Sequence, residues 1–150
     1  METLVATALL VTALAGVAQL VTASARFLLD AGRGETALIA AQAKLESLRS
    51  LAWTYDALGG PISDPSLAPS PAGALDADLE GYSDYLDHGG RAVDRTGEAA
   101  MFRRRWSIVR VDDGAPDALA IEVCVARMGD GVRSALAAEA CLMAVRTRQP

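Results

Sequence analysis

The stretch that decides the fold is Leu4–Ala25, LVATALLVTALAGVAQLVTASA, which contains no charged side chain. Apart from Gln19 and four threonine or serine hydroxyls, its residues are apolar or small. Together with Thr3 it has 23 residues, and a helix of that length reaches roughly 34 Å. The hydrocarbon core of a bilayer is about 30 Å thick, so the stretch is long enough to form a transmembrane helix.

A cleaved signal peptide is the alternative to a membrane anchor, because Ala23-Ser24-Ala25 places small residues where a signal peptidase reads. A signal peptide begins with a basic region and has an apolar core of about 7 to 15 residues. This chain begins with Met1-Glu2 and remains apolar for longer than that. We therefore expect an anchor over residues 1–25 and a separate domain over residues 26–150.

Nearly all of the charge lies outside the apolar stretch. The chain has 150 residues, 51% of them apolar, and a net charge of −5, and every charged side chain except Glu2 follows Ala25. Residues 26–150 are therefore expected to be soluble. An acidic balance argues against nucleic acid or anionic lipid as the main partner, since either favours clustered Lys and Arg.

After Arg26 the pattern becomes amphipathic and typical of a helix with one apolar side. Spacings of 3, 4, 3 and 4 residues separate Leu38, Ala41, Leu45, Leu48 and Ala52. Because no proline precedes Pro61, the pattern predicts one long helix from about Thr3 to Trp53. Its first half needs lipid or partner helices, and its second half needs a sheet to cover. Gly32 and Gly34 are candidates for a kink between the two.

The rest of the chain predicts an irregular connection over residues 54–75, which holds four prolines, and a sheet over residues 82–147. Within the sheet, His88-Gly89-Gly90 lies between two short extended runs and predicts a β-hairpin. Three longer strands are expected at Met101–Val111, Leu119–Met128 and Leu136–Arg146, joined by short links that favour antiparallel pairing.

The middle of these three strands has one branched aliphatic face, which is expected to lie on the helix. That face consists of Leu119, Ile121, Val123 and Val125. The predicted fold class is therefore α+β: a long N-terminal helix, transmembrane in its first half, packed on a small antiparallel β-sheet.

Two segments resemble the type IV pilin-like family. Glu2-Thr3-Leu4-Val5-Ala6 opens a long apolar helix, and Ala43-Lys44-Leu45-Glu46-Ser47-Leu48-Arg49 stands near its end. The second segment resembles the minor members, which are the pilus accessory minor pilins and the minor pseudopilins of type II secretion. The resemblance covers about the first 53 residues, and the order of helix, connection and C-terminal strands fits the same pilin-like plan.

The resemblance implies a role for Glu2. In this family a prepilin peptidase removes a short basic leader after a glycine, methylates the new N-terminus, and leaves a glutamate at the matching position. That glutamate pairs with the N-terminal amine of a neighbouring subunit, which offsets two desolvation costs. No basic leader, cleavage glycine or Phe-x-Leu precedes Glu2 here. Either the encoded start lies upstream of Met1, which we expect, or the chain starts here and is not processed. An interfacial glutamate with no assembly role is the alternative.

The helix residues expected to make subunit contacts are Glu2, Leu4, Val5, Ala8, Thr12 and Ala15. Three of them, Ala8, Thr12 and Ala15, recur at spacings of 4 and 3 residues, and small residues in such a stripe let membrane helices approach closely. The alternative is that alanine merely suits helices.

Other charged and polar groups are expected to be structural. The acidic stretch Asp76–Asp94 has no EF-hand spacing, so we expect a solvated surface, with no metal and no cofactor. His88 is expected to be a turn residue. Arg103-Arg104-Arg105 stands beside Trp106 and offers both charge and a stacking ring to nucleic acid, but on a strand the three arginines point to both faces, which favours a salt-bridged strand.

Cys124 and Cys141 lie on neighbouring candidate strands and would stand opposite each other if Met128 faces Ala137. A disulfide and two buried free thiols are both consistent with that placement.

No nucleophile elbow, phosphate loop or metal-binding helix occurs in the sequence, so we do not expect an enzyme. The sequence predicts a minor pilin or pseudopilin in the bacterial inner membrane, single-pass, with its head in the periplasm or carried into a pilus or pseudopilus. Its expected partners are other pilins or pseudopilins, through the N-terminal helix, and prepilin peptidase. The alternative is a secreted or single-span binding domain whose apolar segment only targets it.

Overall fold

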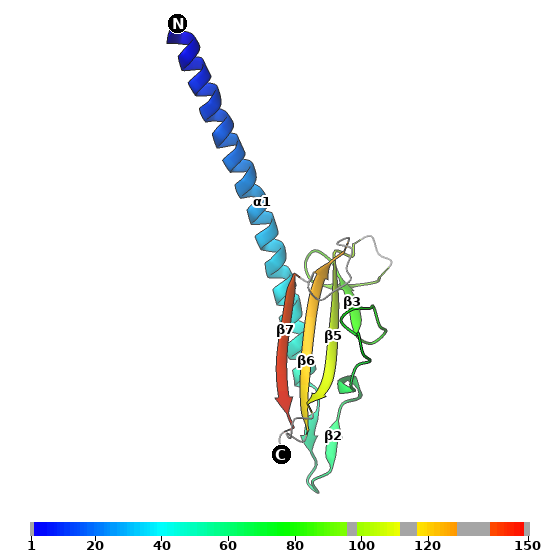
Figure 1. The fold of residues 1–150 in the computed structure, drawn as a ribbon. Coiled ribbons are helices and arrows are strands. Elements are labelled where there is room, and N and C mark those ends of the chain that lie inside the picture. Colours follow the sequence, from blue (N-terminus) through cyan, green and yellow to red (C-terminus); the bar gives the residue numbers. More distant parts are fainter. Residues whose placement is uncertain (1, 96–98, 112–116, 129–138, 149–150) are drawn as a thin grey trace. The chain divides into compact units, whose positions relative to one another are not determined.

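The computed structural model describes residues 2–95, 99–111, 117–128 and 139–148. In chain order its elements are α1 (Glu2–Ser50), β1 (Trp53–Tyr55), β2 (Pro61–Ser63), the 3-10 helix η1 (Pro65–Leu67), β3 (Ser83–Leu86), β4 (Ala92–Val93), β5 (Phe102–Val111), β6 (Ala118–Arg127) and β7 (Ala140–Thr147) (Figure 1). The chain divides into two compact units, Met1–Gly34 and Glu35–Pro150. We call the second unit the head.

The predicted α+β class is confirmed. Five strands of the head form one sheet in the order β4-β3-β5-β6-β7, and every neighbouring pair is antiparallel. A separate two-stranded sheet pairs β1 with β2. The structural division after Gly34 marks where the chain begins to pack into the head. The boundary expected after residue 25 marks where charged residues begin in the sequence. The two boundaries therefore describe different properties of the chain.

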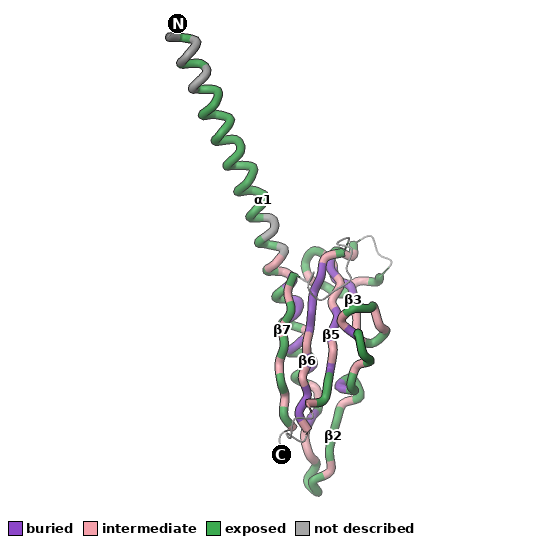
Figure 2. Tube along the Cα trace, viewed as in Figure 1, coloured by how far each residue is buried: buried purple, intermediate pink, exposed green. Residues whose placement is uncertain are grey.

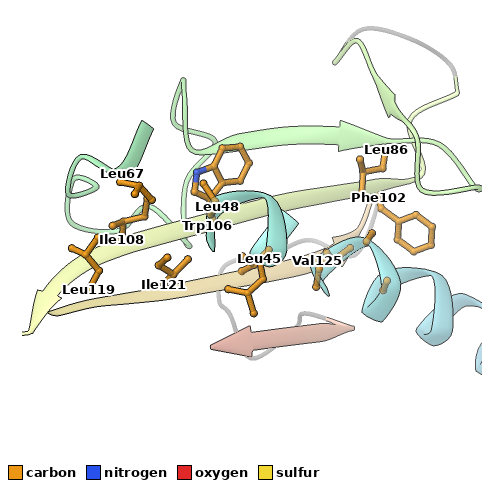
Figure 3. Close-up of a cluster of buried hydrophobic side chains, with 14 of the residues drawn as sticks. Leu45, Leu48, Leu67, Leu86, Phe102, Trp106, Ile108, Leu119, Ile121 and Val125 are labelled. Atoms are coloured by element: carbon orange, nitrogen blue, oxygen red, sulfur yellow. The ribbon is translucent and has the colours of Figure 1, made fainter. Parts of the chain in front are cut away.

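The end of α1 packs on the sheet through a narrow apolar side. Its buried residues are Ala37, Ala40, Ala41, Leu45 and Leu48. They share one core with Leu86, Phe102, Trp106, Ile108, Leu119, Ile121, Val123 and Val125 (Figure 3). The aliphatic face of β6 lies in the same core as the helix, as expected, because all four of those side chains are completely buried and belong to the cluster that contains the buried helix residues.

The predicted helical stripe was partly wrong. Leu38 is 46% exposed, because Ala37 instead faces the sheet and neighbouring helix residues lie about 100° apart around the axis. Ala52 is exposed and lies beyond the helix, which ends at Ser50 and not at Trp53. Trp53 begins β1 because its ring is buried in the head and its Nε1 donates to the Asp117 carbonyl at 3.2 Å.

The connection expected to be irregular contains a hairpin. Trp53 pairs with Ser63 across β1 and β2, and Asp56 closes the turn by accepting from the backbone N–H groups of Leu58 and Gly60. Gly59 has a φ of 80°, a conformation that glycine adopts without strain. The following η1 is capped by Asp64, whose side chain accepts from the Ser66 N–H.

The strand predictions largely hold. β3 and β4 form the hairpin expected around His88, with Tyr85 opposite Val93. β5 and β6 match the expected ranges to within one residue at each end. β7 starts at Ala140 and ends at Thr147, and the expected start of this strand, residues 136–138, lies outside the described residues. β6 is the most continuously buried strand (Figure 2).

Candidate functional site: an apolar helix and a head held by ion pairs

The first candidate site is the surface of α1 over Leu10–Leu28. This segment is long and apolar enough to cross a membrane, and none of it is buried. Its large apolar side chains are 58–76% exposed: Leu10, Val11, Leu14, Val17, Leu20, Val21, Phe27 and Leu28 (Figure 2). A contiguous apolar surface of this kind marks a site of contact with a membrane or another protein. A signal sequence near an N-terminus can also be a helix of this length and hydropathy.

Threonine hydroxyls in this part of α1 are satisfied within the helix. Thr7 Oγ1 donates to the Thr3 carbonyl at 2.9 Å, and Thr22 Oγ1 donates to the Ala18 carbonyl at 2.6 Å. In hydrocarbon no water satisfies polar groups, so each must find a partner inside the protein. These internal hydrogen bonds make the segment compatible with a bilayer.

The residues expected to make subunit contacts all lie in α1. Thr12 and Ala15 are exposed, on the apolar surface just described. The side chains of Glu2, Leu4, Val5 and Ala8 lie outside the described part of the structure, so only their positions in the helix are placed.

In the head, the three successive arginines point to both faces of the sheet, as predicted. Arg104 makes two hydrogen bonds to Asp84, at 2.9 and 2.7 Å, and a third to the Ala40 carbonyl of α1 at 2.8 Å. Arg105 points the other way, where it reaches Asp78 at 2.7 Å and the Leu75 carbonyl at 2.9 Å. The first contact ties the sheet to the helix, and the second ties it to the loop before β3.

Asp78 is the centre of this second cluster. It accepts from Arg105 Nε and from the Tyr85 hydroxyl, both at 2.8 Å, and Arg103 lies 3.4 Å away. Burial alone raises the pKa of Asp78, but the hydrogen bonds and the nearby guanidinium charges outweigh burial, so the pKa lies below its usual value. Part of the acidic stretch therefore serves as an ion-pair partner.

His88 lies in a turn, as predicted. Asp87 Oδ1 accepts from the N–H groups of Gly89 and Arg91, at 2.8 and 2.9 Å, and Gly90 has a φ of 77°. The hydrogen bond from the Arg91 N–H makes the largest contribution to lowering the pKa of Asp87, and the bond from Gly89 adds to it. Together they hold this pKa below its usual value, although burial alone would raise it. The His88 side chain is exposed at the tip of the hairpin.

Cys124 and Cys141 stand opposite each other on β6 and β7 and form a disulfide. Cys124 is buried and Cys141 is exposed. The register relation proposed between Met128 and Ala137 lies partly outside the described residues. Among the residues that the structure describes, one group with metal-ligand geometry occurs, Glu122 with these two cysteines, and sulfurs joined in a disulfide are not thiolate ligands.

The sequence analysis missed the cation–aromatic contacts of the head, of which two are the shortest among the described residues. Lys44 Nζ lies 3.5 Å from the centroid of the Trp106 ring, and the Arg148 guanidinium lies 3.6 Å from that of Trp53. Burial, which outweighs the attraction of Asp84, lowers the pKa of Lys44. No local signal identifies these contacts, because their partners are far apart in the sequence.

Taken together, the described residues define an architecture: an apolar N-terminal helix followed by an α+β head in which Arg103, Arg104 and Arg105 pair with Asp78 and Asp84. Comparisons of the chain with protein-family models, with curated proteins and with solved structures found no match. The functional hypothesis is therefore argued from the apolar surface of α1 and from the way its last turns pack in the head.

Proposed function

We propose that the chain is a pilin-like subunit, a minor pilin or pseudopilin, that takes part in assembling or initiating a type IV pilus or a type II secretion pseudopilus. The observation that carries this proposal is the dual use of α1. Over Leu10–Leu28 the helix exposes apolar side chains all around, and over Ala37–Leu48 it buries one side against an antiparallel sheet.

The energetics favour insertion of the first segment. Full burial of a Val, Leu or Phe side chain stabilises by about 1.5–3 kcal/mol, and eight such side chains between Leu10 and Leu28 are largely exposed. Lipid and neighbouring apolar helices both supply that burial. In this proposal the segment anchors the chain in the inner membrane, packs there against other pilins or pseudopilins, and leaves the head in the periplasm.

Glu2, Leu4, Val5, Ala8, Thr12 and Ala15 are the proposed contact residues. In the proposed assembly Glu2 pairs with the N-terminal amine of a neighbouring subunit after prepilin peptidase has removed a leader encoded upstream. A carboxylate inside hydrocarbon is costly unless it is paired, and such a partner would lower that cost. The pairing of Arg104 with Asp84, and of Arg103 and Arg105 with Asp78, supports protein partners over nucleic acid, because these guanidinium groups already have carboxylates.

Mass spectrometry of the mature N-terminus tests the proposal directly, on the natively encoded protein purified from the membrane of its own host. The expected result is an N-methylated residue shortly before Glu2, with the apolar segment intact. A mature chain that starts at Arg26 would overturn the proposal and leave a secreted binding domain. The peptide that contains Trp106 serves as the internal control, since both outcomes retain it.

A further inference from the structure

The β7 strand leaves one edge of the main sheet open. β7 is the last strand in the sheet order, and within the described ranges it pairs with β6 alone. Its side chains alternate between half-buried and exposed. The exposed ones are Cys141, Met143, Val145 and Thr147. β7 thus presents an open edge beside a row of mostly apolar side chains.

The register shows which backbone groups face that edge. The Cα atoms of Cys124 and Cys141 are 4.1 Å apart, the spacing of a non-hydrogen-bonded antiparallel pair. In agreement, the N–H of Arg148, seven residues after Cys141 and directly after β7, donates to the Asp117 carbonyl at 3.0 Å. The N–H and C=O groups of Met143 and Val145 therefore point away from β6, and unpaired groups of this kind are a template for an added strand.

An open groove of about 380 Å³ adjoins this edge and is lined by Glu46, Arg49, Ser50, Val145, Arg146 and Thr147. Arg49 pairs with Glu46 at 2.9 Å. Arg146 donates to the Leu48 carbonyl at 3.5 Å, and among the described residues it has no carboxylate within salt-bridge distance. Burial and, after it, the positive charge of Arg49 lower the pKa of Arg146. The groove thus has a surplus of positive charge in a chain whose net charge is −5.

We propose that the β7 edge binds an extended, acidic segment of another protein, which adds as a further strand and places a carboxylate on Arg146. Main-chain hydrogen bonds to Met143 and Val145 would supply affinity, and the guanidinium would fix the register. A second copy that presented the same edge would bring Arg49 and Arg146 against themselves, which disfavours a symmetric pair. The inference goes beyond the proposed function and does not depend on it, because only residues of the head carry it.

Photo-crosslinking in whole cells of the native host tests this docking surface with the full-length chain. A photoreactive phenylalanine analogue replaces Met143, and the crosslinked peptides are identified by mass spectrometry. The matched control places the analogue at Leu58, which is 96% exposed in the β1–β2 turn and belongs to no strand of the main sheet. The expected product joins position 143 to a segment of another protein that contains Asp or Glu.

Variants of the groove and of the edge decide the mechanism. Loss of a charge-assisted hydrogen bond is expected to reduce the crosslink yield about tenfold or more in Arg146→Glu, and replacing the partner's acidic residue by Arg should restore it. Val145→Pro removes an N–H that faces the edge while keeping the hydrogen bonds to β6, and edge strands tolerate such a proline. Val145→Pro should therefore also abolish the crosslinked product at position 143, whereas the control variant Val145→Ala should retain most of the crosslink yield.

Four results would overturn the proposal: crosslinks to another copy of this chain, crosslinks to lipid, a yield at position 143 no higher than at Leu58, or a product insensitive to both Arg146→Glu and Val145→Pro. Thermal unfolding of each variant is measured in parallel. If Arg146→Glu unfolds the head because Arg146 only caps the end of α1, Val145→Pro and the partner's charge reversal still decide the outcome.

Discussion

The two halves of α1 have the same secondary structure and opposite surroundings. Over Leu10–Leu28 the large apolar side chains are exposed around the whole circumference. Over Ala37–Leu48 only one side is buried, and three of its five buried residues are alanines. Small side chains let the helix backbone approach the sheet, where Arg104 reaches the Ala40 carbonyl. Both halves therefore form a helix, but they bury their apolar side chains differently. The second half packs on the sheet of the head, whereas the first half has no such cover among the described residues.

Charges placed in the first half should break its membrane insertion, and this is the largest effect that we expect. Each arginine at the centre of a membrane helix costs about 2.5–3.5 kcal/mol on insertion scales. The double variant Val17→Arg/Leu20→Arg should therefore lose most of its membrane-bound fraction, measured by alkaline carbonate extraction. Leu58→Arg, in the exposed turn of the head, is the control and should remain bound. Full retention of the double variant would show that the segment is not the anchor.

Truncation of a buried side chain in the second half should destabilise the head. Leu45 is buried in the core (Figure 3), so Leu45→Ala should lower the free energy of unfolding by about 2–5 kcal/mol. Denaturant unfolding followed by tryptophan fluorescence measures it, since Trp53 and Trp106 are both in that core.

Ile39→Ala is the matched control on the exposed side of the same helix, with an expected change within about 0.5 kcal/mol. Equal losses for Leu45→Ala and Ile39→Ala would contradict the buried side described above.

Acid should weaken the head through Asp78. The pKa of this carboxyl is lower in the folded chain than its ordinary value of 3.8, so between the two values the unfolded chain binds more protons. The stabilisation from Asp78 is complete at a pH above the ordinary pKa of 3.8. It is lost as the pH falls through the lower pKa that Asp78 has in the folded chain. Asp78→Asn should lower the free energy of unfolding at neutral pH by about 1–3 kcal/mol and flatten its decline below about pH 4.

Asp76→Asn provides the comparison for Asp78→Asn, because Asp76 is exposed two residues away. Denaturant unfolding between pH 7 and pH 3 should show the wild-type decline in this variant. An unchanged acid decline in Asp78→Asn would contradict the proposed role of the cluster.

The smallest expected effect concerns the glycines between the two halves. A Cβ on Gly32 meets no atom within 4 Å, so Gly32→Ala should stabilise the helix by about 1 kcal/mol. Slower amide hydrogen exchange around residue 32 in detergent would show it. Gly59→Ala should act in the opposite direction, because the φ of 80° at Gly59 strains any other residue. A faster exchange in Gly32→Ala would contradict a continuous helix at this point.

Much of the fold could be predicted because its signals are local. The aliphatic alternation from Leu119 to Val125 predicted the face of β6 that lies on the helix, and His88-Gly89-Gly90 predicted the hairpin. The phase of the helical stripe could not be predicted to one residue, because Leu38 is as apolar as its neighbours and the choice of Ala37 depends on the sheet. The β1–β2 hairpin was missed because prolines suggested an irregular segment, while Pro61 lies in a short strand.

By itself, the sequence determined that an apolar helix precedes an α+β head in this protein. Those properties depend on side chains within a few residues of one another. Only the tertiary structure decided which groups meet: Arg105 with Asp78, 27 residues apart, and Arg148 with the Thr54 carbonyl beside Trp53, 94 residues apart. It also decided that β7, which contains Arg146, is the last strand in the order of the main sheet. Such pairings depend on how the strands are ordered, and no local pattern of charge or hydrophobicity specifies a distant partner.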